Sequence, residues 1–437
     1  MPETKDGLHN SFAEKAQTFS EGFLKCCIYV CETEGARETF TKRLYANMIA
    51  TSKLLEDFLD SHGAKNNSNW YYYRELVSTV RNLSEATYSQ KHIAKRLPLY
   101  ELADTEAFEE SGYATHRFLV NALRLICRNA LKEAERLGIK LPSERFSWED
   151  FPGITTQTSL DMDIDDENLE EEKKNIVKIT TQFIRVSKEF DVLGFDEPYS
   201  RDQIENIVPG RFNEQEARHF EMIVHSLQSS FDTYVRRSGL RLRDVKLRRL
   251  RGHISIVLHL LEMMRCLLHY YERHLHEVGY KYLYKRVRDD LATAVNPEYL
   301  LDRIVNYGLY YIWQFLSQGQ PLAQDVLNDN MEHGSVQVPV PRELGFHSRP
   351  SMLVAKIVQH YGGQVELWVD SDRFDASSVL DIQWAGGKIQ KDNIHEVVFK
   401  GDMRALRDIQ ILAGVNYGEN SMGKGIPLPH ELFYLKL

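Results

Sequence analysis

Apolar residues recur at helical spacing through almost all of the first 330 residues of this chain. Intervals of three and four residues place them on one face of a helix, and alternating stretches that would indicate strands are few. Helices of this kind bury their apolar stripes against one another, so the pattern predicts a large all-α bundle. The clearest stripes are Leu119, Leu123, Ile126 and Ala130; Phe220, Val224, Leu227, Phe231 and Tyr234; and Leu301, Ile304, Gly308, Ile312 and Phe315.

Two breaks in this pattern indicate linkers. Between residues 141 and 175, prolines and a glycine precede an acidic run from Leu160 to Glu172, whose charges favour a solvated segment. Glycine, proline and asparagine residues punctuate a second stretch from Ser317 to Ser335. We therefore expect a multidomain chain. Its expected parts are a helical subdomain (1–150), an acidic linker (151–175), a second helical subdomain (176–317), a linker (318–335), an α+β domain (336–420) and a C-terminal tail (421–437).

The apolar pattern changes in kind from residue 336 onward. Residues 336–340 alternate, as a strand with one buried face requires, and the stripe from Leu353 to Tyr361 is helical. The order strand, helix, strand, short strand, helix, strand, helix predicts an α+β unit with helices over one face of a sheet. The later segments are a strand at 364–369, a short helix at 377–385, a strand at 394–399 and a helix at 402–412.

The string Gly345-Phe-His-Ser-Arg-Pro350 lies between the first of these strands and the first helix. Pro350 fits the first turn of a helix, which places His347 or Ser348 at the N-cap. The imidazole would then lie beside unpaired backbone N–H groups and the positive end of the helix dipole, which together bind an anion. Arg349 adds a charged, fork-shaped donor for phosphate oxygens. Since phosphoryl transfer needs mainly positioning and charge stabilisation, the string predicts a phosphoryl acceptor at His347.

This string resembles the signature Gly-Leu/Ile-His-Ala-Arg-Pro-Ala of the histidine-containing phosphocarrier protein family, HPr, and it occupies the same place between strand and helix. The resemblance implies an open-faced β-sandwich fold. It also implies that an enzyme I-like donor protein, drawing on phosphoenolpyruvate, phosphorylates a ring nitrogen of His347, and that the group then passes to an unknown acceptor. Arg349 and Ser348 would bind the phosphate, and no cofactor other than the phosphoryl group is implied.

The same resemblance assigns roles to the second helix of the domain. Ser378 falls where the family carries a regulatory serine, and a serine at a helix start is equally expected as an N-cap. Asp381 stands where the family has a glycine, and about one residue is inserted around Gly386-Gly387. These two departures bear on whether the family's usual partners would dock. The apolar docking patch that the resemblance implies is Val379, Leu380 and Trp384.

Composition narrows the class of partner. A net charge of −9 and a pI near 6.0 argue against a surface built for nucleic acid, although a basic stretch runs from Arg236 to Arg251. No window is apolar enough for a membrane span or a secretory signal. Five cysteines without zinc-like spacing indicate reduced thiols in a cytoplasmic protein. The acidic run has Asp166 where a calcium loop requires glycine, so no metal site is expected.

The leading hypothesis is a phosphocarrier or phosphorylation-dependent regulatory protein, in which phosphate on His347 is relayed or switches the fused helical module. One alternative makes the C-terminal domain a non-phosphorylated interaction module on a helical scaffold. Another makes the helical module an enzyme that the C-terminal domain regulates, for which the histidines from His259 to His276 and the pair Tyr270 and Tyr271 are the candidates. The sequence does not decide the role of residues 1–330 or the oligomeric state.

Overall fold

The computed structural model describes residues 5–33, 40–153, 169–235, 244–276, 278–342, 344–361, 364–420 and 423–435 of the 437-residue chain. The chain divides into two compact units. The helical unit comprises Met1–Asp165, Arg185–Asp232 and Gly239–Pro321, and the C-terminal unit comprises Asp166–Ile184, Thr233–Ser238 and Leu322–Leu437.

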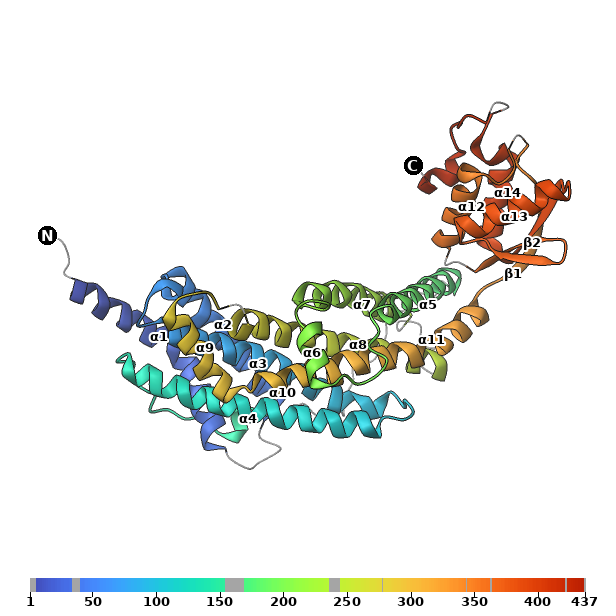
Figure 1. Ribbon diagram of the computed structural model, residues 1–437. Helices are drawn as coiled ribbons and strands as arrows, with labels where there is room; N and C mark the ends of the chain where they lie inside the picture. The colour runs from blue at the N-terminus through green and yellow to red at the C-terminus, as the bar shows by residue number, and fades with distance from the viewer. Residues whose placement is uncertain are drawn as a thin grey trace. The chain divides into compact units, whose positions relative to one another are not determined.

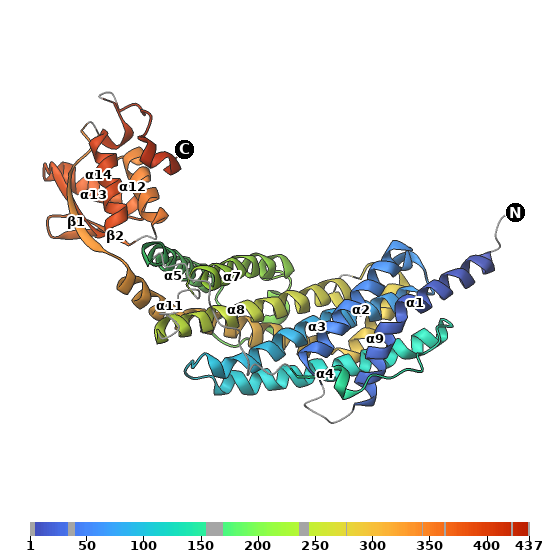
Figure 2. The ribbon, with the colours of Figure 1, turned by 180° about the vertical axis from the view of Figure 1, so that it is seen from behind.

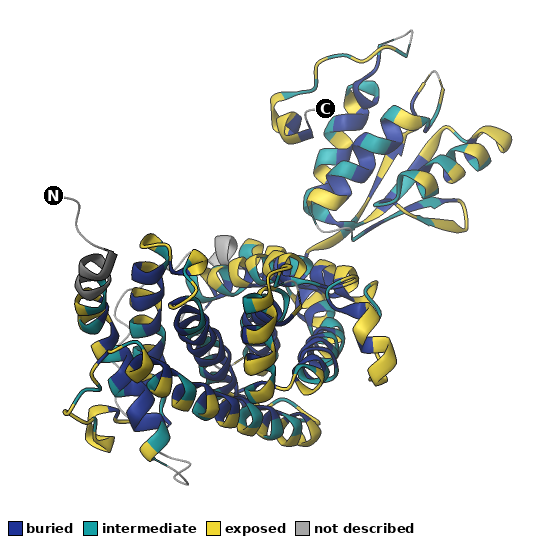
Figure 3. Cartoon of the chain, turned by 60° about the vertical axis from the view of Figure 1, so that its left-hand side comes forward, coloured by how far each residue is buried: buried dark blue, intermediate teal, exposed yellow. Residues whose placement is uncertain are grey.

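The helical unit is built around α3, which contacts α2, α4 and α8 (Figures 1 and 2). Its helices turn their buried residues toward one another and their exposed residues outward (Figure 3). The helices are α1 (Lys5–Glu32), α2 (Lys42–Ser61), α3 (Tyr71–Arg96), α4 (Glu106–Arg136), α6 (Arg201–Ile207), α7 (Glu214–Tyr234), α8 (Val245–Tyr270), α9 (Tyr282–Ala294) and α10 (Pro297–Asp302). Two π-helical segments, η5 (Tyr271–His276) and η6 (Arg303–Leu309), follow α8 and α10, and α5 (Leu169–Asp191) and α11 (Tyr310–Asn330) extend into both units.

The expectation of two separate helical subdomains, 1–150 and 176–317, is wrong. Helix α3 from the first half packs directly against α8 from the second, and both belong to one compact unit. The two halves form one unit because α3 is buried between them, and α3 buries polar side chains such as Arg74, Glu75 and Asn82 as well as apolar ones. A sequence pattern that counts only apolar positions does not reveal a helix buried in this way.

The predicted helical stripes are observed. Leu119, Leu123, Ile126 and Ala130 on α4 are fully buried. The second stripe lies on α7, whose N-terminus is capped by the Asn213 side chain, although Tyr234 at its end is exposed. The third stripe begins after Asn296, which caps α10, but it passes through the π-helical segment η6 rather than a continuous α-helix.

Described parts of both predicted linkers are helical. Helix α11 continues through Pro321 to Asn330, and strand β1 (His333–Pro339) begins three residues later, so the expected linker 318–335 is wrong. Ala323, Val326 and Leu327 supply an apolar stripe that the proline and glycine signals obscured. Helix α5 begins at Leu169, inside the expected acidic linker 151–175. Residues 154–168 of that segment lie outside the described residues.

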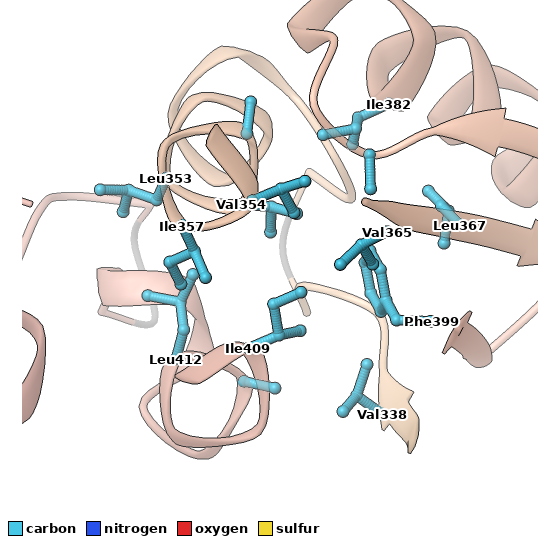
Figure 4. Close-up of a cluster of buried hydrophobic side chains, with 14 of the residues drawn as sticks. Val338, Leu353, Val354, Ile357, Val365, Leu367, Ile382, Phe399, Ile409 and Leu412 are labelled. Carbon is cyan, nitrogen blue, oxygen red and sulfur yellow. The ribbon is translucent and has the colours of Figure 1, made fainter. Parts of the chain in front are cut away.

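From His333 the C-terminal unit has the predicted order of elements. A four-stranded antiparallel sheet has the strand order β1-β4-β2-β3, with Val336 of β1 opposite Phe399 of β4. Side chains from helices α12 and α14, such as Ile357 and Ile409, face strand residues such as Phe399 and Leu367 across an apolar core (Figure 4). The elements after β1 are α12 (Ser348–His360), β2 (Val365–Val369), β3 (Asp372–Asp375), α13 (Val379–Lys391), β4 (Glu396–Asp402) and α14 (Met403–Gly414).

The expected C-terminal tail, 421–437, is not a tail. Leu432 and Leu435 lie on the 3₁₀ segment η8 (His430–Leu435) and are buried in the core of this unit against α12 and α14. Tyr434 stacks on His360 and donates a hydrogen bond to Asp408. The folded unit therefore extends past residue 420, because these apolar side chains complete its core.

Among the described residues, no helix has the length and apolar character that crossing a bilayer requires.

Candidate functional site

The structure places His347 at the N-cap of α12. Its backbone is extended, with φ −80° and ψ −169°, and Ser348 is the first helical residue. Gly345 adopts a left-handed conformation (φ 59°), which lets the His347 N–H donate to the Gly345 carbonyl at 2.9 Å. The buried Ser351 hydroxyl donates to the Phe346 carbonyl at 2.9 Å. These contacts fix the turn that presents the imidazole, whose side chain is 30% exposed.

The first turn of α12 offers unpaired donors beside this imidazole. The N–H groups of Ser348 and Arg349 have no hydrogen-bond partner among the described residues, and Pro350 has no N–H at all. Orphan N–H groups at the positive end of a helix dipole bind anions. The turn therefore forms an anion cradle next to His347.

The Nε2 side of the His347 ring contacts the buried carboxylate of Glu419, a residue that sequence reasoning did not identify. Both carboxylate oxygens of Glu419 lie 3.0 Å from His347 Nε2, and the hydrogen bond is to Oε2. Glu419 is only 3% exposed, and its Oε1 has no hydrogen-bond partner among the described residues. An ionised carboxylate can only accept, so Nε2 carries the proton and the lone pair of the neutral ring is on Nδ1.

The chain after α14 takes an unusual path to bring Glu419 to this position. Asn416, Tyr417 and Gly418 all have positive φ, and such values are uncommon in residues other than glycine. Tyr417 is buried, donates from Oη to the Pro339 carbonyl at 2.8 Å and contacts the Phe346 ring. Glu419 then forms an isolated β-bridge with Gly425. Strained backbone held by tertiary contacts is typical of functional sites.

Arg349 lies against Gly425, the partner of Glu419 in this bridge. A Cβ atom at position 425 would come within 2.4 Å of the Arg349 guanidinium carbon, so only glycine leaves room for that group. Arg349 Nε is buried and has no hydrogen-bond partner among the described residues. An unpaired guanidinium donor beside the anion cradle is available to a ligand oxygen.

Helix α13 packs beside the same turn. The Ser348 hydroxyl accepts a hydrogen bond from Gln383 at 3.3 Å, and Gly386 lies so close that a Cβ there would be 3.1 Å from the Phe346 carbonyl oxygen. This close approach gives a physical reason for glycine in the Gly386-Gly387 segment. The contacts place the outer face of α13 next to the histidine.

The predicted residues at the start of α13 differ in exposure. Ser378 is the N-cap: its hydroxyl accepts from the Asp381 N–H at 3.2 Å and donates to the Asp381 carboxylate at 3.1 Å. This bonding favours the capping interpretation of Ser378. Leu380 and Trp384 are 69% and 77% exposed, whereas Val379 is half-buried against the core. Two of the three predicted docking residues thus form the exposed apolar surface.

The candidate histidines of the helical unit are each paired with a different carboxylate, although the rings of His269 and His274 are 6.2 Å apart. His259 pairs with Glu262 at 2.7 Å, His269 with Glu214 at 2.9 Å, and the buried His274 with Glu75. The described residues contain no group of three or more side chains arranged to hold a metal ion. Burial alone would raise the pKa of Glu75, but the His274 and Arg74 charges outweigh it and lower that pKa. These histidines therefore serve as hydrogen-bond partners of carboxylates within the helical unit.

The basic and acidic stretches fall partly on residues that the structure does not describe. Residues 236–243 of the basic stretch and the aspartates of the acidic run lie outside the described residues. In the described part of the basic stretch, Arg248 pairs with Glu101 at 2.7 Å and Arg251 with Asp232 at 3.0 Å. Both arginines therefore form ion pairs with carboxylates of the helical unit.

Comparisons of this chain with protein-family models, with curated proteins and with solved structures found no match. The functional assignment therefore depends on the geometry around His347.

Proposed function

We propose that the C-terminal unit is a phosphocarrier of the HPr type, in which His347 accepts a phosphoryl group from a phosphoenolpyruvate-dependent donor protein. The group is then relayed to an acceptor or switches the fused helical unit. The observation that carries the proposal is the pairing of His347 Nε2 with the buried Glu419, beside a helix N-terminus with unpaired donors. The finer fold that goes with it is an open-faced β-sandwich with α12, α13 and α14 over one face of the sheet.

The chemistry requires little movement of protons. The Nδ1 lone pair attacks the phosphorus of the phosphorylated donor, an N–P bond forms, and the bond from phosphorus to the donor breaks with its electron pair leaving on the donor. The Nε2 proton remains hydrogen-bonded to Glu419 throughout. The unpaired N–H groups and the Arg349 guanidinium stabilise the charge on the transferred oxygens, which is the main task of a protein in phosphoryl transfer.

Phosphorylation of the intact protein tests the proposal. The full chain is incubated with phosphoenolpyruvate and a general enzyme I, and its intact mass is measured near neutral pH and after acidification. We expect one acid-labile phosphate adduct on the parent chain and none on His347→Ala. His360→Ala, which alters another histidine of α12, is the matched control and should retain the adduct. A parent chain that takes up no phosphate, or a His347→Ala chain that keeps the adduct, would contradict the proposal.

The exposed pair Leu380 and Trp384 favours a second candidate, a protein-interaction module that is never phosphorylated. Large apolar side chains that are exposed side by side are typical of binding surfaces. Under this candidate, Trp384→Ala abolishes capture of a partner protein and His347→Ala leaves it unchanged. Under the phosphocarrier proposal, both substitutions abolish the adduct or slow its formation.

A further inference from the structure

A cavity of about 560 Å³ lies in the helical unit between α3 and α4, with Tyr307 of η6 and Phe40 completing its wall. This volume is within the range of small-molecule binding sites, roughly 300 to 1,000 Å³. It is separate from the His347 site, since all of its described lining residues belong to the helical unit. Most of the exposed surface of its lining is apolar.

The cavity lining includes an internally satisfied polar group among apolar side chains. Tyr307 Oη donates to Gln90 Oε1 at 2.8 Å, and Gln90 Nε2 donates to the Gly112 carbonyl at 3.2 Å. A Cβ at position 112 would lie 2.8 Å from Gln90 Nε2 and 2.9 Å from Tyr307 Oη, so glycine permits this arrangement. The apolar lining residues are Phe40, Ile93, Leu97, Phe108 and Val120.

Tyr307 reaches the cavity from a π-helical segment. The residues Arg303–Leu309 are π-helical between two α-helical segments, and such bulges are frequent at functional sites. Tyr307 is fully buried, and its ring stacks with Phe108 at a centroid distance of 5.6 Å. The aromatic wall is therefore held rigidly in place.

The charged residues around the cavity are predominantly cationic. Glu109 is the only acidic residue among the described lining residues, in a chain whose net charge is −9. An excess of positive charge over a low-dielectric wall attracts anions. The cationic lining residues are Lys91, Lys95, Arg117 and Arg124.

Two polar atoms of the lining residues are buried without a hydrogen-bond partner among the described residues: His116 Nε2 and Arg124 Nε. Arg124 is held in place by a hydrogen bond from Nη2 to the Thr33 carbonyl at 3.1 Å and by the Phe40 ring, 5.1 Å from its guanidinium carbon. Burial, and secondarily the Lys91 charge, lower the pKa of His116 to about 4, so the ring is neutral near pH 7. Arg124 Nε is always a donor, and His116 Nε2 is a donor in one tautomer of the neutral ring, so both atoms can pair with a ligand oxygen.

We propose that this cavity binds an amphipathic anion, with an aromatic or aliphatic body and one carboxylate, sulfonate or phosphate group. The body packs against the apolar wall formed by α3, α4 and Tyr307. The anionic group accepts hydrogen bonds from Arg124 and His116 and faces Arg117 at the rim. The helical unit is then a ligand-binding module in its own right, whatever the C-terminal unit does.

Fluorescence titration of the full chain with 8-anilinonaphthalene-1-sulfonate, an aromatic sulfonate, tests this site. The comparison probe is N-phenyl-1-naphthylamine, which has the same aromatic body and no anionic group. We expect one sulfonate bound per chain, and about tenfold weaker binding of the neutral probe because it lacks the ionic contacts. Equal affinity for the two probes would overturn the assignment of an anion site.

Substitutions locate the bound probe. Ala94 is an exposed residue of the lining, so Ala94→Trp fills the cavity without disturbing the core and should weaken sulfonate binding by about tenfold or more. Arg117→Glu should weaken the sulfonate and leave the neutral probe unchanged. Lys132→Glu, on the same helix but outside the lining, is the charge control and should have no effect. Circular dichroism verifies folding, and sulfonate binding that survives both Ala94→Trp and Arg117→Glu would refute the proposal.

Discussion

The helical unit buries many charged side chains, whereas the core between His333 and Leu435 buries few polar ones. In the helical unit, the buried Arg74 guanidinium contacts three carboxylates, those of Asp60, Glu56 and Glu75, at 2.8 to 2.9 Å. Between His333 and Leu435 the core is apolar, and the described buried polar side chains are Ser351, Asp402 and Glu419.

The difference helps to separate structure from function. A buried charge whose partners are all protein groups is a structural element, because removing a partner leaves an uncompensated charge. Asp402 is of this kind, since it caps α14 and pairs with Arg404. Glu419 is different: both of its oxygens face the Nε2 atom of one partly exposed histidine, and Oε1 accepts no hydrogen bond from the described residues. Incomplete satisfaction beside a reactive group indicates chemistry, so the helical-unit histidines that are paired with carboxylates, His259, His269 and His274, are weaker candidates than His347.

The largest expected effect is on the stability of the helical unit. Arg74→Ala should lower its free energy of unfolding by about 3 to 5 kcal/mol, because three carboxylates lose their common cation. Urea unfolding followed by helical circular dichroism measures the change. Arg288→Ala, which removes an exposed arginine paired with Asp289, is the control and should cost about 0.5 kcal/mol or less. A loss below about 1 kcal/mol in Arg74→Ala would show that this network is not structural.

A smaller effect is expected at the His347 site, and on chemistry rather than stability. Gly425→Ala places a methyl group where the Arg349 guanidinium lies, and the flexible arginine can move away without disturbing the core. We expect phosphoryl uptake to slow about tenfold, equivalent to about 1.4 kcal/mol, since a charge-stabilising donor is displaced. The rate of adduct formation is measured by intact mass.

Gly414→Ala provides the comparison for that substitution. Gly414 ends α14, and a Cβ there would meet no neighbouring atom within 4 Å. This variant should react at the parent rate. An unchanged rate in Gly425→Ala would mean that Arg349 does not contribute in its observed position.

The part of this site that is local in sequence was predictable, and the part that depends on long-range contacts was not. His347 and Arg349 flank one helix start, so proline and helix-capping rules identified them. Glu419 lies 72 residues later and reaches the ring only through the left-handed backbone at Asn416 and Tyr417. No periodicity of the sequence signals such a path.

The same distinction holds for the fold. Apolar periodicity predicted the stripe on α4 and the order of elements after β1, because those elements bury one face. It did not show that α3, which buries charged side chains, packs against α8 of the second half, and it failed for the end of α11, where Pro321 lies inside a helix. In both cases tertiary contacts override the local signal.

The smallest expected effect is a dependence of the helical unit's stability on pH. His253 is 6% exposed, and burial lowers its pKa to about 4, with its hydrogen bond to the Phe315 backbone only partly offsetting this. An unfolded histidine has a pKa near 6.5. Between that pH and about pH 4, His253 is therefore protonated in the unfolded chain and neutral in the folded chain. The resulting stabilisation is complete above about pH 6.5 and is lost as the pH falls toward 4.

Acidification from pH 7.5 to 5.5 should therefore cost the helical unit about 1 kcal/mol through His253. His253→Gln keeps a donor for the Phe315 carbonyl but cannot titrate, so the difference between urea unfolding energies at the two pH values should shrink by that amount. His225→Gln, at an exposed position of α7, should leave the difference unchanged.

Hydrogen exchange resolved by peptide would place the effect in the helical unit, because the core between His333 and Leu435 has no buried histidine among its described residues. An equal reduction in both variants would show that general acidification, and not the burial of His253, causes the loss.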